Sequence, residues 1–293
     1  SNILCSNSYS SMDHNGLYYD YGWIKKLGVQ DPAKMFNDGK WSYSDFTKWI
    51  LDTQDVLGED EYVLEGNPYY IWTGMSNAAG VVTRDSSGNM NLLNDVSKIA
   101  SQLVYNLVER GCIFKGNEDY FKQGKSLMTV TTFSQLKNNM NKYSNMLDEE
   151  KVEYGYVPFP YPDYMSKENT KIAESNKLCF VFPRNKYPEG LSDNLYKEIC
   201  YIVNDINWNT YKYSLSSQEE YYEKIISDYL GSVLFNEQSI KAFKYYDETK
   251  IIYDNNLINS INSESDVSQI FSRIMFEGKD YEQEITKIYE FLN

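Results

Sequence analysis

Histidine and cysteine are scarce in this sequence, which limits its chemistry. A single histidine, His14, excludes histidine-based catalytic triads and most zinc sites unless His14 itself takes part. The four cysteines, Cys5, Cys112, Cys179 and Cys200, include no CxxC pair. Their scatter favours buried free thiols, with one disulfide as the alternative. The motifs GxxxxGK[ST], GxGxxG, GxSxG and HExxH are also missing, so we expect no cofactor, no metal and no catalytic residue.

Long apolar runs and clustered cations are missing as well. No segment approaches the roughly 18 uncharged apolar residues of a membrane span, and the N-terminus does not resemble a signal peptide. The chain has 42 acidic and 28 basic residues, a net charge of −14. This balance argues against nucleic acid and against an anionic membrane surface, because both require clustered cations. A small uncharged or polar partner fits better.

Aromatic residues, in contrast, are abundant. Tyrosine alone occurs 28 times, and hydrophobic residues make up 42% of the 293 positions. Such a chain can bury a large core, and at roughly 100–200 residues per domain its length predicts two domains or lobes. The number of tyrosines exceeds what a core needs, and we therefore expect many of them on surfaces and in clefts that hold polar ligands.

The hydrophobic pattern predicts an α/β chain that becomes helical towards its C-terminus. Strands are expected at 17–20, 61–64, 126–131, 152–158 and 177–182, and helices lie between them. The strongest local signals are a capping-box relation between Ser42 and Asp45 and an amphipathic run over 96–108 that Asn94 or Asp95 caps. Alternating strands and helices followed by helices alone favour an α/β body with a helical C-terminal part.

Several segments carry, in this order, a resemblance to a known family. They are Leu17–Asp20 with Leu27–Pro32, Gly39–Phe46, Asn67–Trp72, Phe121–Met128, Tyr154–Pro160 and the tail that starts at Phe276. They resemble, among others, the "GxWTWDxF" and "EPYFTW" segments of extracellular solute-binding proteins of family 1. These are the maltose-binding-protein-like, substrate-binding proteins of sugar ABC transporters. Asp20 departs from the pattern, since the family usually has asparagine there.

This resemblance implies a periplasmic-binding-protein-like (type II) architecture. Family members usually carry a longer upstream segment, so we expect a complete second lobe, a helical C-terminal part and a first lobe that is largely absent. The implied division is a hinge strand region at 1–14 and an α/β ligand-binding lobe two at 15–182. A crossover with helices of a partial lobe one would follow at 183–230, and C-terminal helices returning to the hinge and lobe two at 231–293.

The resemblance also implies aromatic platforms for a ligand. Tyr69 matches the family's stacking aromatic, and Tyr70 and Trp72 are its neighbours. A second platform falls on Phe133 or Ser134. Such rings would stack on the C–H faces of a sugar, and polar side chains would bind its hydroxyls. The alternative for the tyrosines and Trp72 is ordinary packing in the core.

Two further candidates lie at the hinge. Asp13 matches a carboxylate that the maltose-binding branch places there, where it would accept hydrogen bonds from sugar hydroxyls. His14, beside it, could donate one. The alternative for His14 is a polar loop residue without a ligand.

The implied function is that of the extracellular substrate-binding component of an ABC importer. It would bind a carbohydrate or oligosaccharide between two lobes and work with ABC permease subunits as a monomeric non-enzyme. It would be periplasmic or anchored to the cell surface as a lipoprotein, without direct membrane insertion, its signal or anchor lying outside this chain. Two alternatives remain: a non-transport interaction module with the same fold, and a carbohydrate-active hydrolase, which needs two carboxylates about 5–10 Å apart.

Overall fold

The computed structural model describes residues 2–5, 14–84, 89–115, 119–133, 135–136, 153–174, 179–182, 230–231, 233–234, 236–246, 250–254 and 266–292. The chain divides into two compact units, one of residues 1–13 and 176–232, the other of 14–175 and 233–293. The larger unit thus covers most of the expected lobe two and the C-terminal helices. The strand at 179–182 groups with residues 1–13 in the smaller unit.

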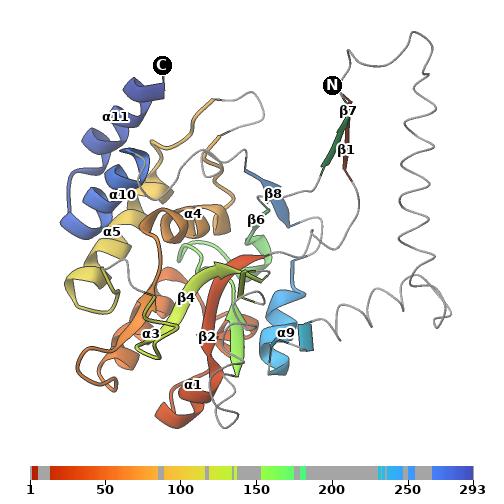
Figure 1. Cartoon of the computed structure of the whole chain (residues 1–293), viewed down its shortest axis with the longest axis vertical. Coiled ribbons are helices and arrows are strands. Elements are labelled where there is room, and N and C mark those ends of the chain that lie inside the picture. Colours follow the sequence, from red (N-terminus) through yellow and green to blue (C-terminus); the bar gives the residue numbers. More distant parts are fainter. Residues whose placement is uncertain are drawn as a thin grey trace, which may run out of the picture. The chain divides into compact units, whose positions relative to one another are not determined.

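A four-stranded sheet forms the centre of the larger unit, in the order β3–β4–β2–β5 (Figure 1). The strands are β2 (Asn15–Asp20), β3 (Tyr62–Glu65), β4 (Ser126–Thr132) and β5 (Tyr154–Val157). β3 is parallel to β4, and β2 is antiparallel to β4 and β5. Strands β3, β4 and β5 therefore all end at the edge of the sheet where β2 begins.

Helices surround this sheet, and α4, α5, α10 and α11 pack into one group (Figure 1). The helices are α1 (Tyr21–Leu27), α2 (Pro32–Asn37), α3 (Tyr43–Gln54), α4 (Pro68–Ala78), α5 (Asp95–Glu109), α9 (Glu237–Phe243), α10 (Asp266–Glu277) and α11 (Tyr281–Leu292), with a 3-10 helix, η2 (Lys167–Asn169). The predicted capping box of α3 is confirmed, with both Ser42 and Asp45 bonds present. Asn94 caps α5 by accepting a hydrogen bond from the Ser97 amide. The described part of the chain contains no helix long and apolar enough to cross a membrane.

Two small sheets complete the described structure. In the larger unit, β6 (Ile172–Glu174) runs parallel to β8 (Ile251–Tyr253). In the smaller unit, β1 (Asn2–Cys5) pairs antiparallel with β7 (Cys179–Phe182). The sequence did not predict β6 and β8, which are three residues long and pair only through contacts between distant parts of the chain.

Tyrosines form much of the core of the larger unit, although the nine that the structure shows as buried are a minority of the 28 in the sequence. Buried tyrosines are Tyr18, Tyr19, Tyr43, Tyr69, Tyr154, Tyr156, Tyr161, Tyr246 and Tyr281. Several donate their hydroxyl to a backbone carbonyl: Tyr18 to His14 at 2.9 Å, Tyr43 to Met75 at 3.1 Å and Tyr281 to Leu92 at 2.7 Å. These three buried tyrosines are accommodated by backbone acceptors close in space, which the composition does not reveal.

Two glycines make room for rings on neighbouring strands. Gly155 on β5 pairs with Tyr19 on β2, and a Cβ at Gly155 would lie 2.2 Å from an atom of the Tyr19 ring. Gly16 on β2 similarly underlies Tyr156, with a Cβ position 2.4 Å from that ring. Only a residue without a side chain leaves space for these aromatic layers on the sheet.

Candidate functional site

The best candidate site is the edge where β3, β4 and β5 end. Ligands of open α/β sheets bind outside the carboxyl ends of the strands. Here Asn15, the first residue of β2, is opposite Thr132, the last residue of β4. α4 starts at this edge too, because only Gly66 and Asn67 separate it from β3. We call the polar set at this edge, Asn15, Tyr70, Thr131, Thr132 and Gln135, the sheet-end surface.

Hydrogen bonds order part of the sheet-end surface. The Thr131 hydroxyl donates to Gln135 Oε1 at 3.0 Å, and the Gln135 amide donates to Thr132 Oγ1 at 3.4 Å. Asn15, Tyr70, Thr131 and Thr132 are half-buried, and Gln135 is exposed. Because the set consists of hydroxyl and amide groups without a formal charge, it suits a neutral ligand rich in hydroxyls.

Gly66 holds the start of α4 against this edge. A Cβ at Gly66 would lie 2.9 Å from Cγ2 of Val130, so the backbone after β3 touches β4 directly. The Asn67 side chain then caps α4 by accepting a hydrogen bond from the Tyr69 amide at 2.9 Å. Close approach and capping together place the first turn of α4, and with it Tyr70, at the end of the sheet.

Tyr69 and Trp72 lie on the inner side of α4. Their exposed fractions are 2% and 1%. The Trp72 indole donates to the Ser97 carbonyl at 3.1 Å, and its ring centre lies 4.5 Å from that of Phe271 on α10. The Tyr69 ring also packs against Phe271, and burial, followed by the charge of Asp254, raises the pKa of its hydroxyl. In this conformation neither ring offers a face to a ligand, as the core alternative predicts.

His14 and Phe133 are also enclosed, in an aromatic cluster around Phe243 of α9. Both are almost fully buried. Ring centres lie 4.5 Å apart for His14 and Phe243, and 5.4 Å apart for Phe133 and Phe243. Tyr156 joins the cluster at 4.9 Å from Phe243. In the described structure this cluster therefore covers the His14 side chain.

Tyr70 is the one predicted platform that the described structure leaves half-exposed. Its ring centre lies 6.0 Å from that of Tyr69, in an edge-on arrangement. Asp13 and Ser134 lie outside the described residues. The sequence interpretation did not single out Asn15, Thr131, Thr132 and Gln135. The threonine-rich end of the predicted strand at 126–131 was the available signal, but placing it required the strand order.

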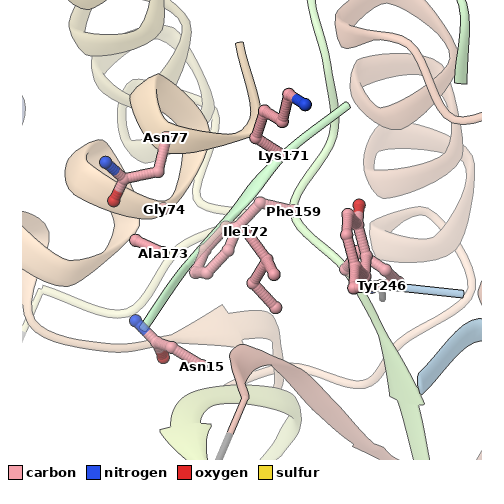
Figure 2. Close-up of a pocket in the computed structure, with 9 residues that line it drawn as sticks. Asn15, Gly74, Asn77, Phe159, Lys171, Ile172, Ala173 and Tyr246 are labelled. Carbon is pink, nitrogen blue, oxygen red and sulfur yellow. The ribbon is translucent and has the colours of Figure 1, made fainter. Parts of the chain in front are cut away.

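A small cavity lies behind this edge, between α4, β6 and the segment that follows β5. Its lining includes Asn15, Asn77, Phe159, Ile172 and Tyr246 (Figure 2). Its volume is about 20 Å³, enough for about one water molecule. In Figure 2 Phe159 and Ile172 lie centrally, and the Lys171 side chain extends away from them. The cavity is too small for a sugar ring, so in this conformation the sheet-end surface is the better ligand candidate.

Metal coordination finds no support among the residues that the structure describes. They include no group of three or more histidine, cysteine, aspartate or glutamate residues that could hold an ion. The remaining acid of interest at this edge is Glu65, the last residue of β3, whose exposed fraction is 7%. Within the described structure its Oε2 atom has no hydrogen-bond partner. Burial raises the pKa of Glu65 from 4.5 to about 7, and the nearby charge of Asp119 adds to this effect.

This shift predicts a stability that depends on pH. Because the folded chain binds the Glu65 proton more tightly than the unfolded chain, the contribution is complete below about pH 4.5 and is lost as pH rises through about 7. We expect Glu65 to account for a loss of about 3 kcal/mol in the free energy of unfolding between pH 4.5 and pH 8. Glu65→Gln should remove this part of the pH dependence in urea titrations.

Glu59→Gln, at an exposed position, is the matched control and should leave the pH profile unchanged. An identical profile for Glu65→Gln and the wild type would show that the Glu65 carboxyl is solvated in solution.

Comparison with known proteins identifies the fold. No protein-family model and no curated protein matches this sequence. Solved structures do match. The sugar-binding protein MalE from Xanthomonas citri is 12% identical with a TM-score of 0.61, and the match covers 94% of this chain and 66% of that one. UgpB from Mycobacterium tuberculosis, in complex with glycerophosphocholine, is 15% identical with a TM-score of 0.57, at 96% and 67% coverage.

The chain has the periplasmic-binding-protein fold. RafE, in complex with raffinose, agrees with this at 14% identity and a TM-score of 0.55, covering 99% of this chain and 76% of that one. The predicted fold class and the resemblance to sugar-binding proteins of ABC transporters are thereby confirmed at the level of architecture. This chain spans about two thirds of the length of the first two structures, in agreement with the expected partial lobe.

Proposed function

We propose that this chain binds a carbohydrate or oligosaccharide as the substrate-binding component of an ABC importer. The observation that carries the proposal is the likeness of its fold to MalE, described as a sugar-binding protein, and to RafE in complex with raffinose. The uncharged hydroxyl and amide groups of the sheet-end surface support a neutral, hydroxyl-rich ligand. This function needs no covalent step, so the proposal is a binding protein and not an enzyme.

Of the predicted site residues that the structure describes, we propose Tyr70 as a direct ligand contact. Asp13 lies outside the described residues and stays a proposal from the family resemblance alone. Tyr70 is half-exposed at the start of α4. The buried candidates Tyr69, Trp72, Phe133 and His14 would act from behind, as the packed layer that positions the edge. This division follows from exposure, because a ring covered on both faces cannot stack on a sugar.

For the biological setting we propose delivery of the ligand to ABC permease subunits, as a monomer outside the cytoplasm. The protein would be periplasmic or surface-anchored as a lipoprotein. Ligand binding would favour the permease-competent state by its higher affinity for that state. Support for this setting comes from the fold and from the acidic charge of −14, which does not suit an anionic membrane surface as a partner.

Ligand screening by thermal unfolding tests the proposal. The panel should contain maltose, laminaribiose and raffinose, with glycerophosphocholine as a non-sugar ligand of a related fold. A ligand at about 100 times its Kd should stabilise the chain by about 2.7 kcal/mol and raise its Tm. Tyr70→Ala should then weaken that ligand about tenfold, because it removes a stacking surface.

Tyr164→Ala is the matched control, since Tyr164 is 73% exposed and lies outside the sheet-end surface. It should leave affinity unchanged. Absence of any shift with the whole panel, for folded protein, would contradict carbohydrate binding. A shift with glycerophosphocholine alone would keep a binding protein but change the ligand class.

A non-transport interaction module with this fold is the second candidate. The observation that favours it is the burial of Tyr69, Trp72 and Phe133, which leaves few open aromatic faces for a sugar. This candidate would be supported if the folded chain binds no ligand of the panel but binds a purified surface protein of the cell that produces it.

A further inference from the structure

Two cysteines that are far apart in the sequence meet in one small sheet. β1 and β7 run antiparallel, side by side, in the smaller unit (Figure 1). The register pairs Asn2 with Phe182 and continues to Cys5, which is directly opposite Cys179. Cys5 is the last residue of β1 and Cys179 is the first of β7, so this pair closes the ladder.

The register places this pair within reach of a covalent bond. Directly opposed residues of antiparallel strands share a face of the ribbon, with Cα atoms about 4.5 Å or about 5.5 Å apart depending on the type of pair. Both separations fall within the roughly 4.4–6.8 Å found across disulfides. The backbone pairing alone therefore meets the main distance requirement.

The small sheet would gain stability from a covalent link between its strands. β1 and β7 have four residues each, and the part of their sheet that the structure describes contains only these two strands. An isolated two-stranded ribbon of this length is marginally stable in water. In the sequence, residues 14–175 of the larger unit lie between β1 and β7. Closing such a long loop costs more chain entropy than closing a short hairpin.

We propose that Cys5 and Cys179 form a cross-strand disulfide. Each thiol loses a proton, the two sulfur atoms join, and two electrons pass to an external disulfide, which is reduced to two thiols. A dithiol oxidase or oxidised glutathione is the class of acceptor required. Such acceptors belong to oxidising compartments. In the cell the inference therefore depends on the location proposed above, but not on the ligand.

The bond would join two strands of the smaller unit that lie near its connections to the larger unit in the sequence. The chain passes from one unit to the other between residues 13 and 14, between 175 and 176, and between 232 and 233. Cys5 lies shortly before the first passage and Cys179 shortly after the second. A disulfide there would hold the strand before the first passage and the strand after the second passage against each other.

Cys112 is the natural internal control. It lies in the larger unit, is buried as a free thiol, and burial raises the pKa of its sulfur above the usual value. A thiol that is buried and protonated exchanges poorly with external disulfides. We therefore expect Cys112 to stay reduced under conditions that oxidise the Cys5–Cys179 pair.

The test is a disulfide map of the full chain after incubation with reduced and oxidised glutathione, on the folded monomer isolated by size exclusion. We expect a linked peptide that contains Cys5 and Cys179. Of the four cysteines, two should then titrate as thiols in denaturant. Cys5→Ser and Cys179→Ser should each raise the number of titratable thiols from two to three. Cys200→Ser should keep the linked peptide.

Stability gives a second readout. A phosphine reductant should lower the Tm of the wild type and leave that of the Cys5→Ser/Cys179→Ser double variant unchanged. Four titratable thiols in the folded wild type, or a linked peptide that contains Cys112 or Cys200, would overturn the inference. If the variants fail to fold, the wild-type map alone decides. Because the glutathione buffer supplies the oxidant, the result does not depend on the cellular compartment. Sugar binding is measured in a separate experiment, so the disulfide proposal and the proposed function can fail independently.

Discussion

Trp72→Ala should lower the free energy of unfolding by about 4 kcal/mol, as expected for truncation of a buried tryptophan. Trp72 is 1% exposed, and its ring is 4.5 Å from the Phe271 ring. Its indole N–H also satisfies the Ser97 carbonyl at 3.1 Å. Truncation removes contacts among α4, α5 and α10 at once. Urea unfolding followed by circular dichroism measures the loss.

The same variant distinguishes core packing from ligand binding. Trp72→Phe keeps a ring in place and should recover part of the stability, although the Ser97 carbonyl loses its donor. Tyr164→Ala, at an exposed position, should change stability by less than about 0.5 kcal/mol. A stable Trp72→Ala protein with weakened sugar affinity would show instead that Trp72 contacts the ligand.

Asp254→Ala is the second substitution with a large expected effect, a loss of roughly 3–5 kcal/mol. The buried Asp254 carboxylate accepts hydrogen bonds from Asn77 Nδ2 at 3.1 Å, from the Thr83 amide at 3.0 Å and hydroxyl at 2.6 Å, and from the Arg84 amide at 3.3 Å. Alanine would leave these donors without an acceptor, and each buried unsatisfied group costs about 1–3 kcal/mol, not fully additively. Chemical denaturation measures the total.

Hydrogen exchange locates the effect of Asp254. This residue follows β8, and its partners lie at the end of α4 and in the segment after it. Asp254 therefore joins the C-terminal part of the chain to α4. The Thr83 amide should lose protection in Asp254→Ala and keep part of it in Asp254→Asn. Asp52→Ala, whose partner Lys48 is exposed, should cost less than about 1 kcal/mol. Unchanged protection of Thr83 would contradict this role of Asp254.

These two residues illustrate different limits of sequence interpretation. The sequence indicated Trp72 as a site neighbour with core packing as the alternative, and in the structure its contacts are with Ser97 and Phe271. Asp254 carried no signal at all, because one aspartate among 42 acidic residues is unremarkable. Its importance follows only from donors that lie far away in the chain.

The sheet-end surface also depends on contacts between distant parts of the chain. Strand order brings Thr131 and Thr132 of β4 beside Asn15 of β2, which defines the sheet-end surface. Family resemblance directed attention to aromatic residues, of which only Tyr70 remains half-exposed in the described structure. The panel of ligands therefore tests a surface composed mainly of hydroxyl and amide groups, with one ring beside it.

The sequence by itself determined the features whose hydrogen bonds span a few residues. The Ser42–Asp45 capping box, the Asn94 cap and the α/β pattern are local, and the acidic charge is a matter of composition. Only the tertiary structure decided which aromatic rings are buried, which unit contains β7, and that Cys5 is opposite Cys179. The physical reason is that burial and register depend on partners distant in the chain, and a single sequence does not encode those distances in any local pattern.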